Sequence, residues 1–88
     1  MSNSELIATL VILADVCNYS VHAHFPEEFI RRKAKPDELK QRIGKNLKKL
    51  RSKGFAQIKP TRGGPTWTIT KIGMEEIQRG FPNLRQVD

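Results

Sequence analysis

A segment in the middle of the chain carries the pattern of an amphipathic helix with a defined start and a defined end. Pro36 suits a first helical turn, and Asp37 and Glu38 follow it at the positive end of the helix dipole. The apolar residues after them recur in steps of four, four and three, which places them on one buried stripe: Leu39, Ile43, Leu47 and Leu50. Gly54 stands where many helices end in a left-handed residue. The pattern predicts a helix from about Pro36 to Ser52.

A first helix is predicted near the start of the chain. Ser4 is its expected N-cap and Glu5 its first residue, and helical spacing marks these inward positions: Leu6, Leu10, Leu13 and Cys17. Further apolar residues flank this stripe: Ile7, Val11 and Ala14. They cover more than one face, so we expect a single small core to leave part of the helix for a partner chain.

Two shorter elements are predicted between these helices. Residues 18–25 alternate apolar and polar side chains, which indicates a brief edge strand. A short helix then begins at Pro26, and we expect Phe29 and Ile30 to turn inward from it.

The last third of the chain predicts a hairpin and a final helix. Phe55 and Ile58, then Trp67 and Ile69, indicate two strands, and we expect Trp67 to lie in the core. A loop from Lys59 to Thr66 joins them, because its turn residues continue a strand poorly: Pro60, Gly63, Gly64 and Pro65. The final helix begins within 70–73, points Met74 and Ile77 inward, and ends at Gly80 and Pro82.

The length of 88 residues suits one domain, 1–88, with an ordered core of about 4–81 and a flexible tail over 83–88. The longest apolar stretch, from Leu6 to Cys17, is too short to cross a bilayer as a helix. No signal-peptide arrangement is found, and Cys17 is the single cysteine. We therefore expect a cytoplasmic protein in a reducing compartment, without a disulfide and without a membrane partner.

Positive charge is concentrated in the middle of the chain. Residues 1–30 contain four acids and no Lys or Arg, whereas residues 31–62 contain thirteen Lys and Arg and two acids. Residues 63–88 are balanced, so this block accounts for the formal net charge of +7. Such segregation indicates a polyanionic partner, because each neutralised phosphate releases condensed counterions.

Two motifs resemble those of winged helix-turn-helix regulators. The first is a helix end that leads into a strand: Leu47, Lys48, Lys49, Leu50, Arg51, Ser52, Lys53, Gly54 and Phe55. The second is a strand end that leads into a helix: Trp67, Thr68, Ile69, Thr70, Lys71, Ile72 and Gly73. The resemblance covers the chain from the first helix to about Phe81. It implies an α+β winged helix-turn-helix fold with a three-helix core, a small antiparallel wing sheet and a C-terminal helix.

This resemblance also implies a docking mode and a set of site residues. Helix 36–52 would enter the major groove of double-stranded DNA, and the wing, 59–66, would touch the backbone or the minor groove. Opposite Ile43 the helix carries Gln41, Lys45, Lys48 and Ser52, flanked by Arg42 and Lys49. We expect Gln41 to pair with adenine and Arg42 or Lys45 with guanine, whereas Lys48 and Lys49 meet phosphate. In the wing, we expect contacts from Lys59 and Arg62, with added hydrogen bonds from Thr61 and Thr66.

Two other groups of residues invite a chemical interpretation. On a strand, His22 and His24 would share a face near Cys17, as in an incomplete zinc site, but no second cysteine completes it. Glu27 and Glu28 invite a general acid or base interpretation, but adjacent acids in a first helical turn usually serve the helix dipole. No nucleophile or phosphate-binding glycine motif accompanies them. We expect no enzyme activity, no metal, no cofactor and no small-molecule substrate.

Three functions fit these observations. The first is a transcriptional regulator that dimerises through the Leu6–Cys17 helix and binds pseudo-palindromic sites. Because the predicted DNA-facing side is rich in lysine and poor in Asn, Ser and Thr, the second is a non-specific architectural protein that binds DNA or RNA. The third is a winged-helix protein-interaction module whose lysines are solvated surface.

Overall fold

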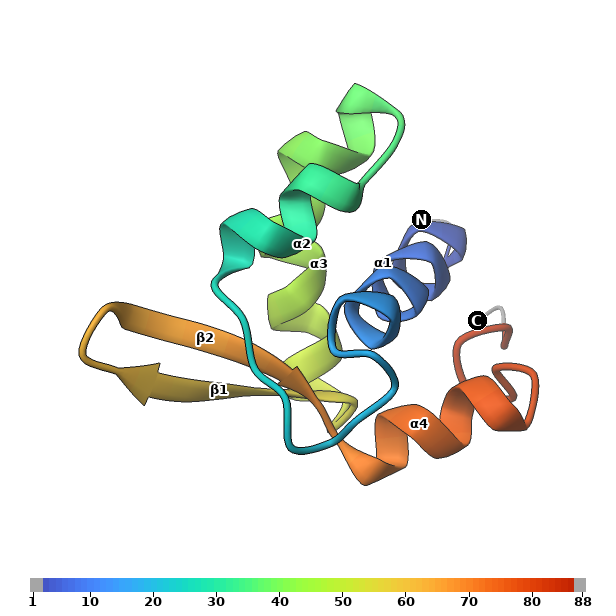
Figure 1. Ribbon diagram of the computed structural model, residues 1–88. Coiled ribbons are helices and arrows are strands. Elements are labelled where there is room, and N and C mark those ends of the chain that lie inside the picture. Colours follow the sequence, from blue (N-terminus) through green and yellow to red (C-terminus); the bar gives the residue numbers. More distant parts are fainter. Residues whose placement is uncertain (1–2, 87–88) are drawn as a thin grey trace.

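The computed structural model describes residues 3–86, which form an α+β fold (Figure 1). Its elements in chain order are α1 (Ser4–Val16), α2 (Glu27–Lys33), α3 (Asp37–Ser52), β1 (Ala56–Thr61), β2 (Gly64–Ile69) and α4 (Lys71–Gln78). Within residues 3–86, no helix is both long enough and apolar enough to cross a membrane.

The core lies between α1, α2 and α3, and buried residues of the hairpin and Leu84 also belong to it. The predicted bounds of α3 are confirmed within one residue, and its predicted stripe from Leu39 to Leu50 is buried. The inward positions predicted for α1 are buried as well, from Leu6 to Cys17. Its start differs slightly from the prediction, because Asn3 rather than Ser4 occupies the N-cap position. Gly54 has a φ of 86°, the left-handed conformation expected at the end of α3.

The strands β1 and β2 form a tighter hairpin than the sequence pattern predicted. Thr61 pairs with Gly64, so the turn is Arg62 and Gly63 rather than the whole span from Lys59 to Thr66. Pro60 and Pro65 lie within the strands and face each other. The backbone N–H and C=O of Trp67 both form hydrogen bonds with Phe25. They therefore point away from β1, and the pair Ile58 and Trp67 is a non-hydrogen-bonded pair. In an antiparallel ladder, hydrogen-bonded and non-hydrogen-bonded pairs alternate, so Pro60 and Pro65, two positions along, also form a non-hydrogen-bonded pair. A proline has no backbone N–H, and at such a pair the ladder needs none.

The edge strand predicted over 18–25 is wrong except at its last residue. Phe25 forms an isolated bridge with Trp67, on the side of β2 away from β1, while 18–24 are turns and irregular chain. The prediction that Phe29 turns inward is also wrong. It is 44% exposed, not turned inward, and its ring stacks on Phe25 with centroids 5.7 Å apart. Ile30 is fully buried as expected, and so is Trp67 at 3% exposure.

The helix α4 begins at Lys71, within the predicted span 70–73, and Thr70 is its N-cap. The Thr70 hydroxyl accepts a hydrogen bond from the Gly73 backbone N–H and donates one to the Gly54 carbonyl, so one side chain caps α4 and ties it to the end of α3. Met74 and Ile77, predicted to point inward, are partly buried against the core.

The chain stays packed beyond Phe81, where we expected the ordered core to end. Leu84, assigned to a flexible tail from the sequence, is 1% exposed. Asn3 donates a side-chain hydrogen bond to the Gln86 carbonyl at 3.2 Å, so the segment after α4 returns to the start of α1. Residues 87 and 88, the end of the predicted tail, lie outside the described part.

Candidate nucleic-acid interface

The outward face of α3 carries the residues that the sequence placed there. Gln41, Lys45, Lys48 and Ser52 are all exposed, opposite the buried Ile43. The Ser52 hydroxyl donates to the Lys49 carbonyl at 2.7 Å and is therefore occupied by its own helix. The acids of α3, Asp37 and Glu38, lie in its first turn, so the remaining three turns present a face without carboxylates.

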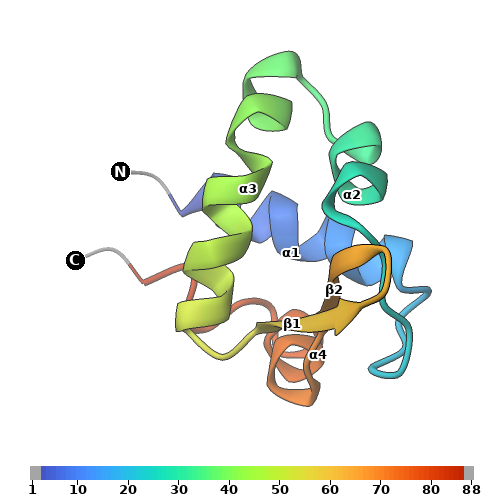
Figure 2. The same cartoon turned by 90° about the vertical axis from the view of Figure 1, so that its left-hand side faces the viewer.

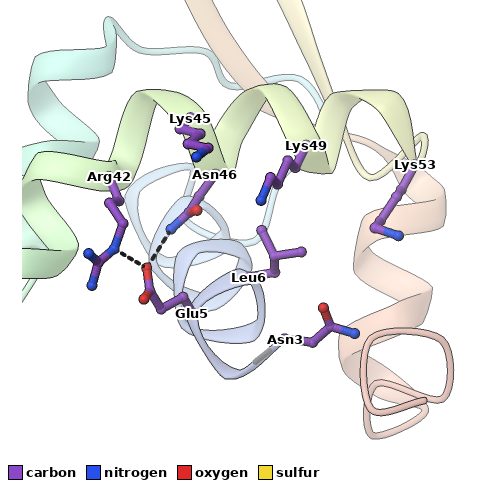
Figure 3. A pocket seen from close by; sticks show the side chains of 8 residues that line it. All are labelled: Asn3, Glu5, Leu6, Arg42, Lys45, Asn46, Lys49 and Lys53. Carbon is purple, nitrogen blue, oxygen red and sulfur yellow. Dashed lines mark hydrogen bonds and ion pairs between the residues drawn. The ribbon is translucent and has the colours of Figure 1, made fainter. Parts of the chain in front are cut away.

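One flank of α3 faces the start of α1, and there the predicted guanine contact Arg42 makes an ion pair. Its Nε donates to Glu5 Oε1 at 2.8 Å (Figure 3). This hydrogen bond lowers the pKa of the Glu5 carboxyl and raises that of the Arg42 guanidinium. Arg42 remains half exposed, but it lies at the edge of the outward face rather than at its centre. Lys49 lies on the same flank and is half-buried.

Asn46 is a polar residue of this flank that the sequence analysis missed. It is buried, and its amide donates to Thr9 Oγ1 at 3.2 Å and to Glu5 Oε1 at 3.4 Å. Its spacing could have revealed it, because residues 39, 43, 46 and 50 form an inward stripe in steps of four, three and four. Asn46 thus joins α3 to α1 and fixes the carboxylate that holds Arg42.

The opposite flank of α3 packs closely on α2. The connection between the two helices spans residues 34–36. A Cβ at Gly44 would lie 3.1 Å from Glu27 Oε2, so the glycine permits this approach. Arg31 pairs with Glu27 at 2.8 Å and donates from Nε to the Lys40 carbonyl at 3.1 Å. The close contact of Gly44 with Glu27 and the two interactions of Arg31 join α2 to α3.

The hairpin tip presents two of the predicted basic contacts. Lys59 and Arg62 are exposed, and Arg62 occupies the turn. The predicted threonine contacts are already engaged: Thr61 donates to the Gly64 carbonyl and Thr66 to the Lys59 carbonyl, both at 2.7 Å. Thr66 is also buried, so it stabilises the hairpin rather than offering a free hydroxyl.

Cys17, His22 and His24 do not converge in the structure. Cys17 is fully buried and burial raises the pKa of its thiol, whereas His22 is exposed. The Nδ1 atom of His24 lies 2.9 Å from Thr66 Oγ1. In the described part of the chain, no three metal-ligating side chains come together.

A group of exposed Lys and Arg therefore lies on α3, its C-cap and the hairpin, and α3 and the hairpin lie in front of α1 in Figure 2. Other exposed Lys and Arg lie on α2, on the connection to α3, on α4 and after α4. The three ion pairs found within residues 3–86 use Arg31, Arg32 and Arg42. Four exposed cations of α3 and the hairpin take part in none of these pairs: Lys45, Lys48, Lys59 and Arg62. This surface can attract a chain of phosphates without first breaking an internal ion pair.

No family model matches this chain, and neither does any curated protein or solved structure.

Proposed function

We propose that this protein is a transcriptional regulator that binds double-stranded DNA through a winged helix-turn-helix. Support for this fold comes from the order of elements and from the isolated bridge. Three packed helices precede a hairpin, and Phe25 adds a one-residue third strand to its β2 side. The closely packed pair α2 and α3, with its three-residue connection, corresponds to the helix-turn-helix unit.

The observation that carries the proposal is the outward face of α3 after its first turn, which carries no carboxylate and lies beside a basic hairpin tip. The helix has 16 residues and is about 24 Å long, and its outward face is narrow enough to enter a major groove. In this arrangement Gln41 and Lys45 read base edges, while Lys48 and Lys49 contact phosphates. Lys59 and Arg62 bind the adjacent backbone or minor groove.

Arg42 has a modified role in this arrangement. Glu5 occupies its Nε, which leaves the two terminal nitrogens as donors. Held at the α1 edge of α3, they would meet the rim of the major groove. A guanine at the end of the recognised sequence is therefore the base that Arg42 would contact.

We also propose that the protein forms a homodimer through α1, but through a different face of this helix than its inward residues. The inward residues of α1 are used by the core of their own chain, so a partner would bind the opposite face. That face presents Val11, which is 38% exposed, flanked by the half-buried Ala8 and Ile12. A two-fold dimer would match a pseudo-palindromic site and double the phosphate contacts.

Fluorescence anisotropy tests the proposal. The whole chain is titrated with a duplex selected from a random pool and with an unselected duplex, at low and at physiological salt. We expect a preference of about a thousandfold for the selected duplex that survives physiological salt. Lys48→Ala should weaken binding to both duplexes, whereas the matched control Lys71→Ala, which removes an exposed charge on α4, should not. Failure to bind either duplex would exclude the function.

A second candidate is a non-specific architectural protein. It is favoured by the chemistry of the α3 face, where Ser52 is occupied by its own helix and lysines surround Gln41. Lysine is a point charge that suits phosphates more than base edges. Equal and steeply salt-dependent binding to the two duplexes would establish this second function instead.

A further inference from the structure

The chain segment before α2 covers one face of the hairpin. Thr66 and Thr68 alternate with the core residue Trp67 and so point to the opposite face of β2, yet they are buried, at 5% and 2% exposure. Thr68 donates to the Val21 carbonyl at 3.4 Å, and Thr66 contacts the His24 ring. The segment passes beside β2 (Figure 1). It therefore lies against the hairpin that the proposed function assigns to the DNA backbone.

The hydrogen bonds of Thr66 fix which nitrogen of neutral His24 carries the proton. The Thr66 hydroxyl donates to the Lys59 carbonyl at 2.7 Å, and a hydroxyl has one hydrogen to donate. The His24 Nδ1 atom, 2.9 Å from the same hydroxyl oxygen, is therefore the donor of their hydrogen bond. The lone pair of the neutral ring is then on Nε2. His24 is exposed, and within residues 3–86 no hydrogen-bond partner of Nε2 is found.

Protonation of this ring adds a donor without breaking its existing bond. A charged imidazole donates from both nitrogens, so Nδ1 keeps its hydrogen bond to Thr66 while Nε2 gains an N–H. Histidine is the side chain that ordinarily changes charge between about pH 5 and 8. Mild acid therefore turns Nε2 from an acceptor, which offers nothing to a phosphate oxygen, into a charged donor that a phosphate oxygen accepts.

The charges around His24 favour an anion. Lys59 lies directly opposite Thr66 in the register, so its side chain projects from the face of the hairpin that His24 contacts. Residues 16–26 and 56–69, the segment of His24 and the hairpin, contain no Asp or Glu. Their charged and titratable side chains besides His24 are Cys17, Tyr19, His22, Lys59 and Arg62.

The first acids after this segment already have cationic partners. Glu27 pairs with Arg31 at 2.8 Å, and Glu28 pairs with Arg32 at 3.1 Å, both within α2. The segment and the hairpin thus offer a charged His24 no carboxylate, and a phosphate can take that place.

We infer that His24, in its charged form, contacts a backbone phosphate of the bound DNA beside Lys59. The inference rests on the proposed function, and it adds a residue from outside the wing to the contacts. It also makes DNA binding depend on pH in one direction. The contribution of His24 is present in mild acid and is lost as the pH rises and the ring becomes neutral.

The first test measures duplex affinity by fluorescence anisotropy at fixed salt, at about pH 5.5 and about pH 7.5, on either side of the usual histidine titration. Wild type should bind about two- to fivefold more tightly at the lower pH, the size of one exposed ion pair. His24→Asn should remove this difference, because its amide can donate to Thr66 as Nδ1 does but carries no charge. His22→Asn is the matched control, since it removes the other histidine of the chain, which is exposed on the same segment, and it should keep the wild-type difference.

The other outcomes of this test contradict the inference in different ways. A pH difference that persists in His24→Asn overturns it and leaves the proposed function standing. A loss of affinity in His24→Asn that is equal at both pH values also overturns it, because that result gives His24 only a structural role at Thr66. A wild type that binds no duplex at either pH defeats the proposed function, and this inference falls with it.

A second test follows the His24 ring by NMR in the wild-type protein and needs no variant. Linkage is reciprocal, so a proton that tightens DNA binding is itself held more tightly in the complex by the same factor. Adding duplex should therefore move the titration midpoint of His24 upward by about 0.3 to 0.7 pH units, which corresponds to two- to fivefold. A midpoint that moves no more than that of His22 overturns the inference. Inorganic phosphate is the competing ligand: if it moves the His24 midpoint as far as the duplex does, the site binds a small anion and the inference is wrong.

Discussion

Glu76 is a carboxylate buried on α4 that fixes the segment after this helix. It is 3% exposed and accepts three hydrogen bonds: from the Asn83 and Leu84 backbone N–H groups and from the Asn83 side chain, at 2.8 to 2.9 Å. Glu76→Ala leaves these donors without their acceptor, so we expect a loss of about 1 to 3 kcal/mol in the free energy of unfolding. Urea denaturation measures it, with the neighbouring Glu75→Ala as control. Equal effects of the two variants would show that the hydrogen bonds do not stabilise the fold.

Glu5 connects stability to pH through a single residue. Its pKa is lowered in the folded chain, chiefly by the hydrogen bond from Arg42. A lowered pKa gives stability that is present above the unfolded pKa and is lost as the pH falls through the folded pKa. Glu5→Gln should therefore be less stable than wild type at pH 7, and the difference should vanish in strong acid. Urea midpoints at both pH values test this. A difference that persists in acid would assign the effect to packing instead.

The same substitution acts on DNA binding in the opposite direction. Removing the Glu5 charge adds +1 to the α1-facing flank of α3 and weakens the hold on the Arg42 guanidinium, because an amide oxygen accepts a hydrogen bond without a negative charge. Glu5→Gln should bind duplex more tightly and with a steeper salt dependence than wild type. Anisotropy titration at two salt concentrations measures both quantities. Weaker binding would indicate that Glu5 positions Arg42 for its contact and that this positioning outweighs the added charge.

Among the elements, α4 depends on one glycine where it meets the end of α3. A Cβ at Gly73 would collide with the Phe55 carbonyl oxygen and lie 2.9 Å from Ile69 Cγ1. Because the obstacle is backbone, Gly73→Ala should cost about 1 to 3 kcal/mol of stability. Gly63→Ala in the hairpin turn is the matched control, since its Cβ would meet only Thr61 Oγ1 at 3.9 Å. Thermal unfolding of both variants checks the prediction, which fails if their midpoints coincide.

The elements that the sequence predicted well are those specified by local patterns. The α3 stripe and the Thr70 cap each depend on residues a few positions apart, so spacing alone identifies them. The pairing of Phe25 with Trp67 and the ion pair of Glu5 with Arg42 join residues about forty positions apart. No pattern within one segment specifies such contacts, because they depend on how the elements pack. The predicted length of the hairpin loop was wrong for a different reason. The sequence shows two prolines, but it does not show that they face each other at a non-hydrogen-bonded pair, where strands tolerate proline.

At the scale of the whole molecule, the separation of charge divides the surface by role. Residues 3–30 contain no Lys or Arg, and α1 lies behind α3 and the hairpin in Figure 2. Two chains of formal net charge +7 repel each other, so association is least opposed at a face poor in positive charge. The outer face of α1 meets this condition and carries the exposed Val11. DNA and a second copy could therefore bind the protein together without competing for one surface.

A charged substitution on the outer face of α1 should prevent dimerisation without preventing DNA binding. We expect wild type to sediment as a dimer at micromolar concentration and Val11→Lys as a monomer, because the substitution puts two lysines against each other across the two-fold axis. Ile72→Lys is the matched control, since Ile72 is 56% exposed and belongs to α4 rather than to α1. The monomeric variant should still bind a half-site, but it should lose the added affinity of a pseudo-palindromic site. A wild type that sediments as a monomer at every concentration would exclude the dimer. DNA binding through α3 would then involve one chain at one half-site.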